Sequence, residues 1–144
     1  MEVRERKMNP TIEYLGQVLR ADHKLDALIE RSQRYMDHAT RATSRLTATR
    51  VSGTGHRSNV EDAVLAMVDL SREIEREMSL FVEKVREIDA MIAKVPDDRH
   101  RDLLRWRYLN GWPWDRISEG LGCERRWTLA MHGRALLEVE KNLK

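Results

Sequence analysis

The placement of proline and glycine constrains this fold more than any other feature of the sequence. No proline lies between Pro10 and Pro96, and the glycines of that stretch fall at one position near its start and in the segment 50–58. Proline and glycine are the residues that most often end helices. The sequence therefore predicts two long helices, over 10–49 and 58–95, joined by a loop over 50–58.

Capping residues stand where these helices should begin and end. Asn9 can cap the first helix, with Pro10 at its first position, where the missing N–H costs nothing. Ser58 and Glu61 have the spacing of a capping box at the start of the second helix. Pro96 should end that helix, because proline disfavours helical geometry in the residue before it.

Apolar residues recur along both segments in steps of three and four, which is typical of coiled-coil packing. In the first segment the stripe comprises Leu15, Val18, Asp22, Leu25, Ile29, Ser32, Met36, Ala39, Thr43 and Leu46. In the second it comprises Val60, Val64, Met67, Ser71, Ile74, Met78, Phe81, Val85, Ile88, Ile92 and Val95. Two striped helices joined by a short loop predict a long antiparallel hairpin.

The charges favour pairing of these two helices. Residues 1–58 carry 11 Lys and Arg against 7 Asp and Glu, whereas residues 59–96 carry 5 against 9. Further apolar residues lie beside the main stripes: Leu19, Leu28, Leu65, Leu70, Leu80 and Met91. A homo-oligomer that buries this second face is therefore a reasonable hypothesis.

After Pro96 the predicted elements become short. Asp97 or Asp98 can cap a helix that Asn110 and Gly111 end, a very short helix follows Pro113, and a last helix runs over about 124–142. The inner face of the last helix should comprise Thr128, Met131, Ala135, Leu136 and Val139. Three helices in this length have the size of a helix-turn-helix module. We expect an all-α chain with a helical hairpin over 1–96 and that module over 97–144.

In a helix-turn-helix the last helix enters the major groove of DNA by its N-terminal turn. The outward positions there would be Arg125, Arg126, Trp127 and Ala130, and arginine suits both guanine and phosphate. Arg134 could touch a phosphate or pair with Glu138. Four further arginines are candidate phosphate contacts, although those near 45–57 could simply keep an exposed loop soluble: Arg116, Arg45, Arg50 and Arg57.

Other chemistry-bearing residues favour structural roles. Trp112 and Trp114 are more consistent with a packing corner than with binding. The five histidines are scattered without metal-site spacing, so we expect no metal and no cofactor. Cys123 is expected to be buried where two helices cross. Nothing in the sequence converges on a catalytic pocket, so an enzyme is the least favoured class.

The segment "RYLNGWPWDRISEGLGCERRWTLAMHGRALLEVEK" resembles region 4 of sigma-70-type factors. The matching positions are Arg107, Tyr108, Gly111, Ile117, Leu121, Gly122, Ala135 and Leu136. The chain is more closely similar to small phage and prophage proteins of Gram-positive bacteria related to RinA- and ArpU-type late-gene regulators. These place such a module, often with an "HGRAL" segment as at 132–136, behind a long helical region.

This resemblance implies a phage-type transcriptional regulator that binds double-stranded DNA, acts as a homo-oligomer and can contact RNA polymerase. The alternative is an adaptor or assembly protein, such as a small-terminase-like packaging factor, that does not read sequence. Leu129 and Ala130 stand where the family commonly has polar residues, so part of this surface could meet protein instead. One cysteine and no long apolar run or secretory leader predict a cytoplasmic protein without a membrane segment.

Overall fold

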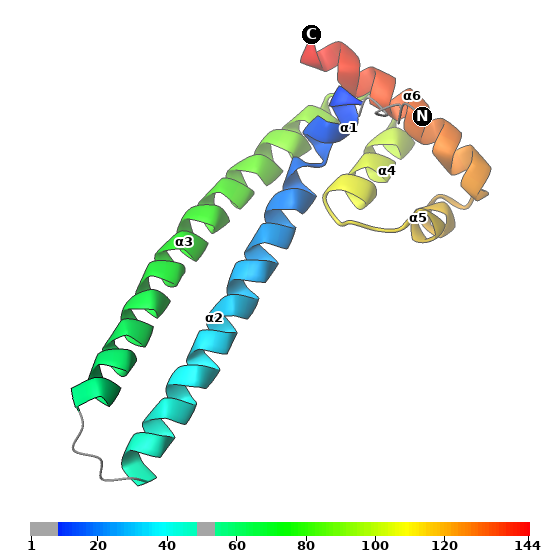
Figure 1. The fold of residues 1–144 in the computed structure, drawn as a ribbon. Coiled ribbons are helices and arrows are strands. Elements are labelled where there is room, and N and C mark those ends of the chain that lie inside the picture. The colour runs from blue at the N-terminus through cyan, green and yellow to red at the C-terminus, as the bar shows by residue number, and fades with distance from the viewer. Residues whose placement is uncertain (1–8, 49–53) are drawn as a thin grey trace, which may run out of the picture. The chain divides into compact units, whose positions relative to one another are not determined.

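The structure is a computed structural model that describes residues 9–48 and 54–144, and side chains over 9–45 and 59–144. Every element within these residues is helical, which confirms the all-α prediction. The helices shown in Figure 1 are α1 (Pro10–Leu15), α2 (Gln17–Ala48), α3 (Thr54–Ala93), α4 (Asp98–Tyr108), α5 (Trp114–Leu121) and α6 (Arg125–Leu143).

The first helical segment begins as predicted and is interrupted near its start. The side chain of Asn9 accepts a hydrogen bond from the Thr11 N–H at 2.9 Å and so caps α1. The helix from 10 to 49 is not continuous, because α1 ends at Leu15 and α2 begins after Gly16. Arg20 donates to the Glu13 carbonyl at 2.7 Å across this break. A long side chain thus satisfies a carbonyl that the interruption leaves without a helical partner.

The second long helix begins four residues earlier than the sequence predicted. α3 starts at Thr54, so the prediction of Ser58 as N-cap and of a loop over all of 50–58 is wrong. Extending an existing helix is cheap compared with starting one, and an internal glycine costs only about 1 kcal/mol. The glycine at 55 is therefore carried within the first turn of α3 instead of ending it.

Packing divides the chain into two compact units, residues 21–80 and residues 1–20 with 81–144. The predicted domains, 1–96 and 97–144, stay a prediction about independent folding. The packing itself groups the end of α3 with the C-terminal helices. The two units are described separately below as the helix pair, residues 21–48 and 54–80, and the C-terminal unit.

In the helix pair, α2 and α3 run side by side in opposite directions (Figure 1). Leu25, Leu28 and Leu70 are buried between them. Lys24 Nζ forms an ion pair with Glu77 Oε1 at 2.8 Å across the two helices. This antiparallel contact sets the register: a residue further along α2 lies level with one earlier in α3.

The predicted stripe coincides only in part with the buried seam of the helix pair, because Leu25 belongs to both. Leu28 and Leu70 are buried although the stripe had placed them beside the seam. The stripe positions Ile29, Met36 and Val64 are instead 38%, 54% and 49% exposed. A stripe drawn with a period of 3.5 residues drifts around a helix of 3.6 residues per turn. The drift explains why the seam moves to adjacent residues.

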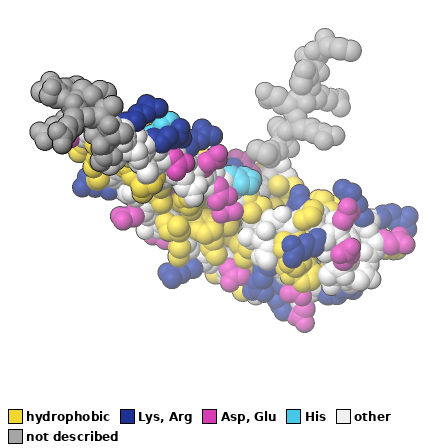
Figure 2. Space-filling model, turned by 90° about the horizontal axis from the view of Figure 1, so that it is seen from below, with side chains coloured by type: hydrophobic (Ala, Val, Ile, Leu, Met, Phe, Trp, Pro, Cys, Tyr) yellow, Lys and Arg dark blue, Asp and Glu magenta, His cyan; other side chains and the backbone are white. Residues whose placement is uncertain are grey.

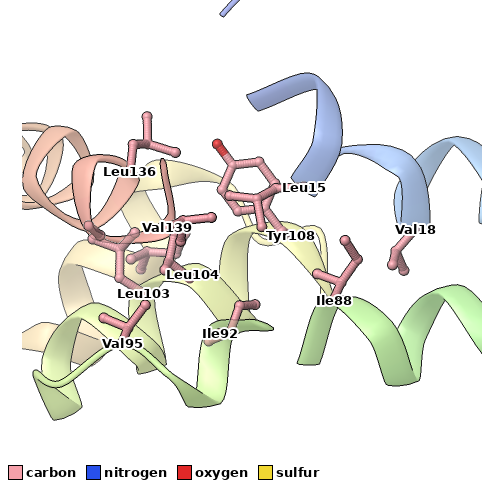
Figure 3. Close-up of a cluster of buried hydrophobic side chains, with 12 residues drawn as sticks. Leu15, Val18, Ile88, Ile92, Val95, Leu103, Leu104, Tyr108, Leu136 and Val139 are labelled. Atoms are coloured by element: carbon pink, nitrogen blue, oxygen red, sulfur yellow. The ribbon is translucent and has the colours of Figure 1, made fainter. Parts of the chain in front are cut away.

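The C-terminal unit has the dense core of the protein. Its buried side chains come from α1, the start of α2, the end of α3 and the last three helices, as Figure 3 shows for ten of them. The core comprises Leu15, Val18, Ile88, Ile92, Val95, Leu103, Leu104, Tyr108, Ile117, Ala135, Leu136 and Val139. For α6, the predicted inner positions Thr128, Ala135 and Val139 are fully buried.

Polar contacts hold the connections of this unit. Asp97, one of the two predicted caps, accepts from the N–H groups of Arg99 and His100. The guanidinium of Arg101 donates to the carbonyls of Val95 and Pro96 at 2.6 and 3.0 Å. These bonds fix the turn between α3 and α4, so that α4 packs on the end of α3.

Leu103 tests the importance of this core. Leu103→Ala should lower the free energy of unfolding by about 2–5 kcal/mol, because it leaves a cavity at a side chain with no solvent exposure. Leu137→Ala, at a leucine that is 57% exposed on α6, is the matched control and should cost less than about 1 kcal/mol. Urea unfolding of both variants gives the comparison, and equal losses would contradict this assignment of the core.

Candidate nucleic-acid interface

The turn between α5 and α6 has a defined geometry. Gly122 adopts a left-handed conformation, with φ of 67°. Its N–H donates to the Glu119 carbonyl at 3.2 Å, and the Cys123 N–H donates to the Ser118 carbonyl at 3.1 Å. This pair of bonds is the Schellman ending of a helix, for which glycine is the favoured residue. The chain therefore reverses within three residues, 122–124, before α6 begins.

A buried hydroxyl pair then fixes α6 against α5. Ser118 Oγ donates to Thr128 Oγ1 at 2.9 Å, and Thr128 Oγ1 donates to the Glu124 carbonyl at 3.2 Å. Both side chains are buried, at 7% and 0% exposure. A buried hydroxyl is costly without a partner, so these bonds favour one rotation of α6 about its axis. Cys123, which was expected to be buried, is only half-buried, with Sγ 3.4 Å from Thr128 Oγ1.

That rotation decides which α6 side chains face outward. Arg126, Ala130 and Arg134 are spaced four residues apart and are all exposed. Trp127 is exposed to 53% and Leu129 to 42%. The predicted set from α6 is thus accessible, and most of it shares one side of the helix.

Arg125 differs from the other members of that set. Its Nη1 lies 3.7 Å from Asp115 Oδ1 of α5, and both side chains are well exposed. An exposed ion pair of this kind is worth at most about 1 kcal/mol. Arg125 is therefore held toward α5 by a contact that an anionic ligand can displace. The guanidinium of Arg126 lies 5.4 Å from the ring centroid of Trp127.

Arg116 stands at the end of an aromatic stack. Its guanidinium lies 3.9 Å from the ring centroid of Trp112, which stacks on Trp106 at 5.1 Å. A Cβ on Gly120 would lie 3.0 Å from Trp106, so this glycine permits the close approach of α5. Trp106 and Trp112 pack against the core, which supports the interpretation of a packing corner. Arg116 itself remains exposed beside this stack.

The remaining candidate phosphate contacts are Arg45, Arg50 and Arg57, which lie in the sequence around the end of α2 and the start of α3. Arg45 lies in the last turn of α2 and is exposed. Arg50 lies outside the described residues. Arg57 falls within α3, but its side chain also lies outside the described part. Whether these three arginines act together with those of α6 therefore stays a prediction.

A cluster around His132 was not anticipated from the sequence. A hydrogen bond of 2.7 Å joins Tyr108 Oη and His132 Nε2, and the Trp114 ring meets the imidazole edge-on at 4.6 Å. Arg107 lies 4.3 Å from the Trp114 ring centroid and donates to the Trp112 carbonyl at 3.1 Å. The four side chains join α4, α5 and α6. No spacing rule would have found them, because they come from three elements.

Burial governs the titration of this cluster. It lowers the pKa of His132 to about 4, with the positive charge of Arg107 acting in the same direction. Burial also raises the pKa of Tyr108 to about 12, partly opposed by Arg107. His132 is therefore neutral at pH 7 and serves as a structural hydrogen-bonding partner of Tyr108.

Comparison with known proteins gives one match. A family model described as "Protein of unknown function (DUF1492)" matches residues 41–140, which is more than two thirds of the chain. The chain belongs to the DUF1492 family. The match covers the described α3, α4 and α5 and nearly all of α6, so the DUF1492 model includes the α5–α6 turn and the exposed side of α6. No curated protein and no solved structure matches the chain.

Two features are absent from the described residues of this DUF1492 protein. No group of three or more His, Cys, Asp or Glu side chains there is placed to hold a metal ion. None of the described helices is both long and apolar enough to cross a membrane.

His132 should make stability depend on pH in a defined direction. Its pKa is about 4 in the folded chain and about 6.5 when unfolded, so the unfolded state binds more protons between these values. Stability should therefore fall as pH drops from about 6.5 toward 4. With allowance for partial solvent screening, we expect a loss on the order of 1–2 kcal/mol.

His132→Gln, which keeps a hydrogen-bonding group but removes the titration, is the comparison variant. The difference in unfolding free energy between wild type and variant, measured from pH 7.5 to 4.5, isolates His132 from the other histidines. Parallel curves would contradict the assignment.

Proposed function

We propose that this DUF1492 protein is a DNA-binding transcriptional regulator, with α5, the 122–124 turn and α6 acting as a helix-turn-helix. In this proposal α6 enters the major groove by its N-terminal half, and α5 lies across the backbone. Arg126, Ala130 and Arg134 face the DNA, with Arg125 and Trp127 beside them. The observation that carries the proposal is the exposed side of α6 opposite its buried residues.

The shape of α6 supports this proposal. Ala130 is small and exposed, and a Cβ at Gly133 would meet nothing within 4 Å. This side of the helix can therefore approach a groove wall closely. The three arginines of the first three turns can contact base edges or phosphates with bidentate geometry.

The start of α6 supports it as well. Glu124 stands at the N-cap without a capping hydrogen bond from its side chain, and the first turn of α6 carries no acidic residue. The N–H groups of this turn, together with Arg125 and Arg126, make an environment that favours a phosphate. We infer that the N–H groups and Arg125 position the helix on the backbone, whereas Arg126 and Arg134 supply the sequence reading.

One module makes few phosphate contacts, so useful affinity needs two copies on spaced half-sites. In this proposal the helix pair supplies the second copy through homo-oligomerisation. Contact with RNA polymerase would be a further use of the same helices. The expected origin, phage or prophage, and the expected cytoplasmic location remain part of the proposal.

A second candidate function is a phage assembly or polymerase-binding adaptor that does not read sequence. The observation that favours it is the apolar character of the α6 surface, where Trp127, Leu129 and Leu137 are 53%, 42% and 57% exposed. Large exposed apolar side chains commonly mark a protein interface. Sequence dependence separates the two functions, because a regulator should prefer its site by several kcal/mol.

Selection from a randomised duplex pool at near-physiological salt tests the proposal. The wild type should enrich one motif, and Arg125→Ala/Arg126→Ala should lose it, with binding to the selected site weaker by about 10- to 1000-fold. Arg31→Ala/Arg86→Ala removes the same charge from exposed positions outside α6 and is the matched control. It should keep the motif.

Two outcomes would count against DNA reading. If the wild type enriches nothing, the adaptor function becomes the better one. If both double variants lose affinity equally, the effect is one of net charge and not of the α6 surface.

A substitution at Asp115 should raise the affinity for DNA instead of lowering it. Asp115→Asn removes the carboxylate that holds Arg125 and repels phosphate, so affinity for the selected duplex should rise by about two- to fivefold. Fluorescence anisotropy at two salt concentrations measures this. Unchanged affinity would mean that Arg125 does not face the DNA.

A further inference from the structure

The second half of α2 carries a row of basic side chains. Successive members are four, three and four residues apart, which places them on one side of the helix: Arg34, His38, Arg41 and Arg45. All four are exposed. Figure 2 shows Lys, Arg and His side chains gathered next to the grey segment at the end of the helix pair. These four residues are here called the basic row.

The basic row points away from α3. With about 100° of rotation per residue, its three arginines lie about 130–170° round α2 from the buried seam of Leu25 and Leu28. Arg31 lies about 60° from the middle of these arginines, toward Lys24, and is not part of the row. The basic row is therefore on the solvent side of α2, where α3 does not cover it.

Few acidic residues of α2 offset this charge. From 38 to 60 the sequence contains no Asp or Glu. Glu30 forms an ion pair with Arg34 at 3.3 Å, and both side chains are well exposed, so a phosphate can replace this contact. Asp37 lies beside the row and forms no ion pair within the described residues.

The acidic residues of α3 at the same level are separated from the basic row. The register set by Lys24 and Glu77 places Asp62 and Asp69 level with about residues 39 and 32 of α2. They belong to the other helix, so the thickness of α2, about 10 Å, stands between them and the arginines. That distance exceeds the screening length of about 8 Å at physiological ionic strength. The row therefore keeps its positive potential.

The chemistry of the basic row suits the phosphates of a duplex. A guanidinium binds phosphate oxygens with two parallel hydrogen bonds. From Arg34 to Arg45 the helix rises about 17 Å, and DNA carries about one phosphate per 1.7 Å of its axis, so the row can face several phosphates. No large apolar side chain shares this side of α2 over 23–45, although a lipid surface or the centre of a protein interface favours such residues.

We propose that the basic row binds the phosphate backbone of double-stranded DNA without reading its sequence. The choice of DNA as the partner rests on the proposed function, to which the row adds a second contact on α2, separate from α6. Phosphate contacts supply affinity for any duplex, whereas base contacts supply the preference for one site. The chain thus binds any duplex weakly through α2 and its own site more tightly through α6.

Fluorescence anisotropy of a labelled duplex of random sequence, about 20 base pairs long, tests the proposal with the full-length chain over a range of salt concentrations. Arg41→Gln/Arg45→Gln should lower the affinity about 5- to 20-fold at about 50 mM salt. It should also reduce the slope of log affinity against log salt by about 2, because each lost phosphate contact removes about 0.9.

The matched control is Arg72→Gln/Arg76→Gln. It removes the same charge from exposed positions on α3 and should leave the affinity within about twofold of wild type. Circular dichroism of both double variants shows whether they keep their helix content.

A substitution beside the basic row tests the sign of the effect. Asp37→Asn removes a carboxylate that repels phosphate, so the affinity for the same duplex should rise about twofold. Glu75→Gln removes one carboxylate from an exposed position on α3 and should leave the affinity unchanged.

Vesicles of phosphatidylcholine with about 30% phosphatidylserine provide the alternative anionic surface. The wild type should not co-sediment with them at near-physiological salt, because the row lacks apolar residues that enter a bilayer. Three outcomes would overturn the proposal: no binding of the random duplex at about 50 mM salt, equal weakening by the two double variants, or binding to vesicles, but not to DNA, that depends on the row.

The duplex selection separates this proposal from the reading of sequence by α6. Arg41→Gln/Arg45→Gln should still enrich the wild-type motif, because the row does not contact bases. A wild type that enriches a motif but binds random duplex independently of the row would leave only this inference wrong. A wild type that enriches no motif, yet binds random duplex through the row, would leave only the sequence-reading proposal wrong.

Discussion

The burial of one side of α6 is the constraint on which the candidate interface depends. Thr128, Ala135 and Val139 are fully enclosed, and the Ser118 hydroxyl meets Thr128 inside the same contact. Apolar burial holds the helix in place, whereas the hydroxyl pair favours one rotation, because any other would leave two buried groups without partners. The outward arginines thus owe their positions to residues on the opposite side of the helix.

Aromatic side chains stabilise the packing of α4, α5 and α6. Trp112, half-buried, stacks on Trp106, and Trp114 meets His132. Arg107 and Arg116 each place a guanidinium over a tryptophan ring, at 4.3 and 3.9 Å. Such contacts add buried aromatic area to the aliphatic core of this unit, since each ring buries a large area. A unit built this way can leave most of one helix side free for a partner.

Much of this fold could be predicted because it follows from local rules. The caps Asn9 and Asp97 and the inner positions of α6 come from neighbours within one turn, which a single sequence displays. The buried residues of the helix pair could not be predicted as accurately. Whether Leu28 or Ile29 is buried depends on small rotations accumulated along the helix. The two adjacent residues have similar apolar character, so the sequence does not distinguish them.

In the candidate site, too, the features set by local spacing could be predicted and those set by contacts between helices could not. The exposure of Arg126, Ala130 and Arg134 follows from their spacing from buried residues on α6. By contrast, the contact of Arg125 with Asp115 and that of His132 with Tyr108 depend on how separate helices meet. Such contacts require the packed arrangement of several elements, which spacing along the chain does not contain.

The positions of the tryptophans give the two units different optical properties. All four lie between 106 and 127, three packed and one exposed, and residues 21–80 contain none. Indole emission from this chain therefore originates only in the C-terminal unit, whereas the helical dichroism comes from both units. A change in that emission therefore reports on the surroundings of these four rings, of which Trp127, on α6, is 53% exposed.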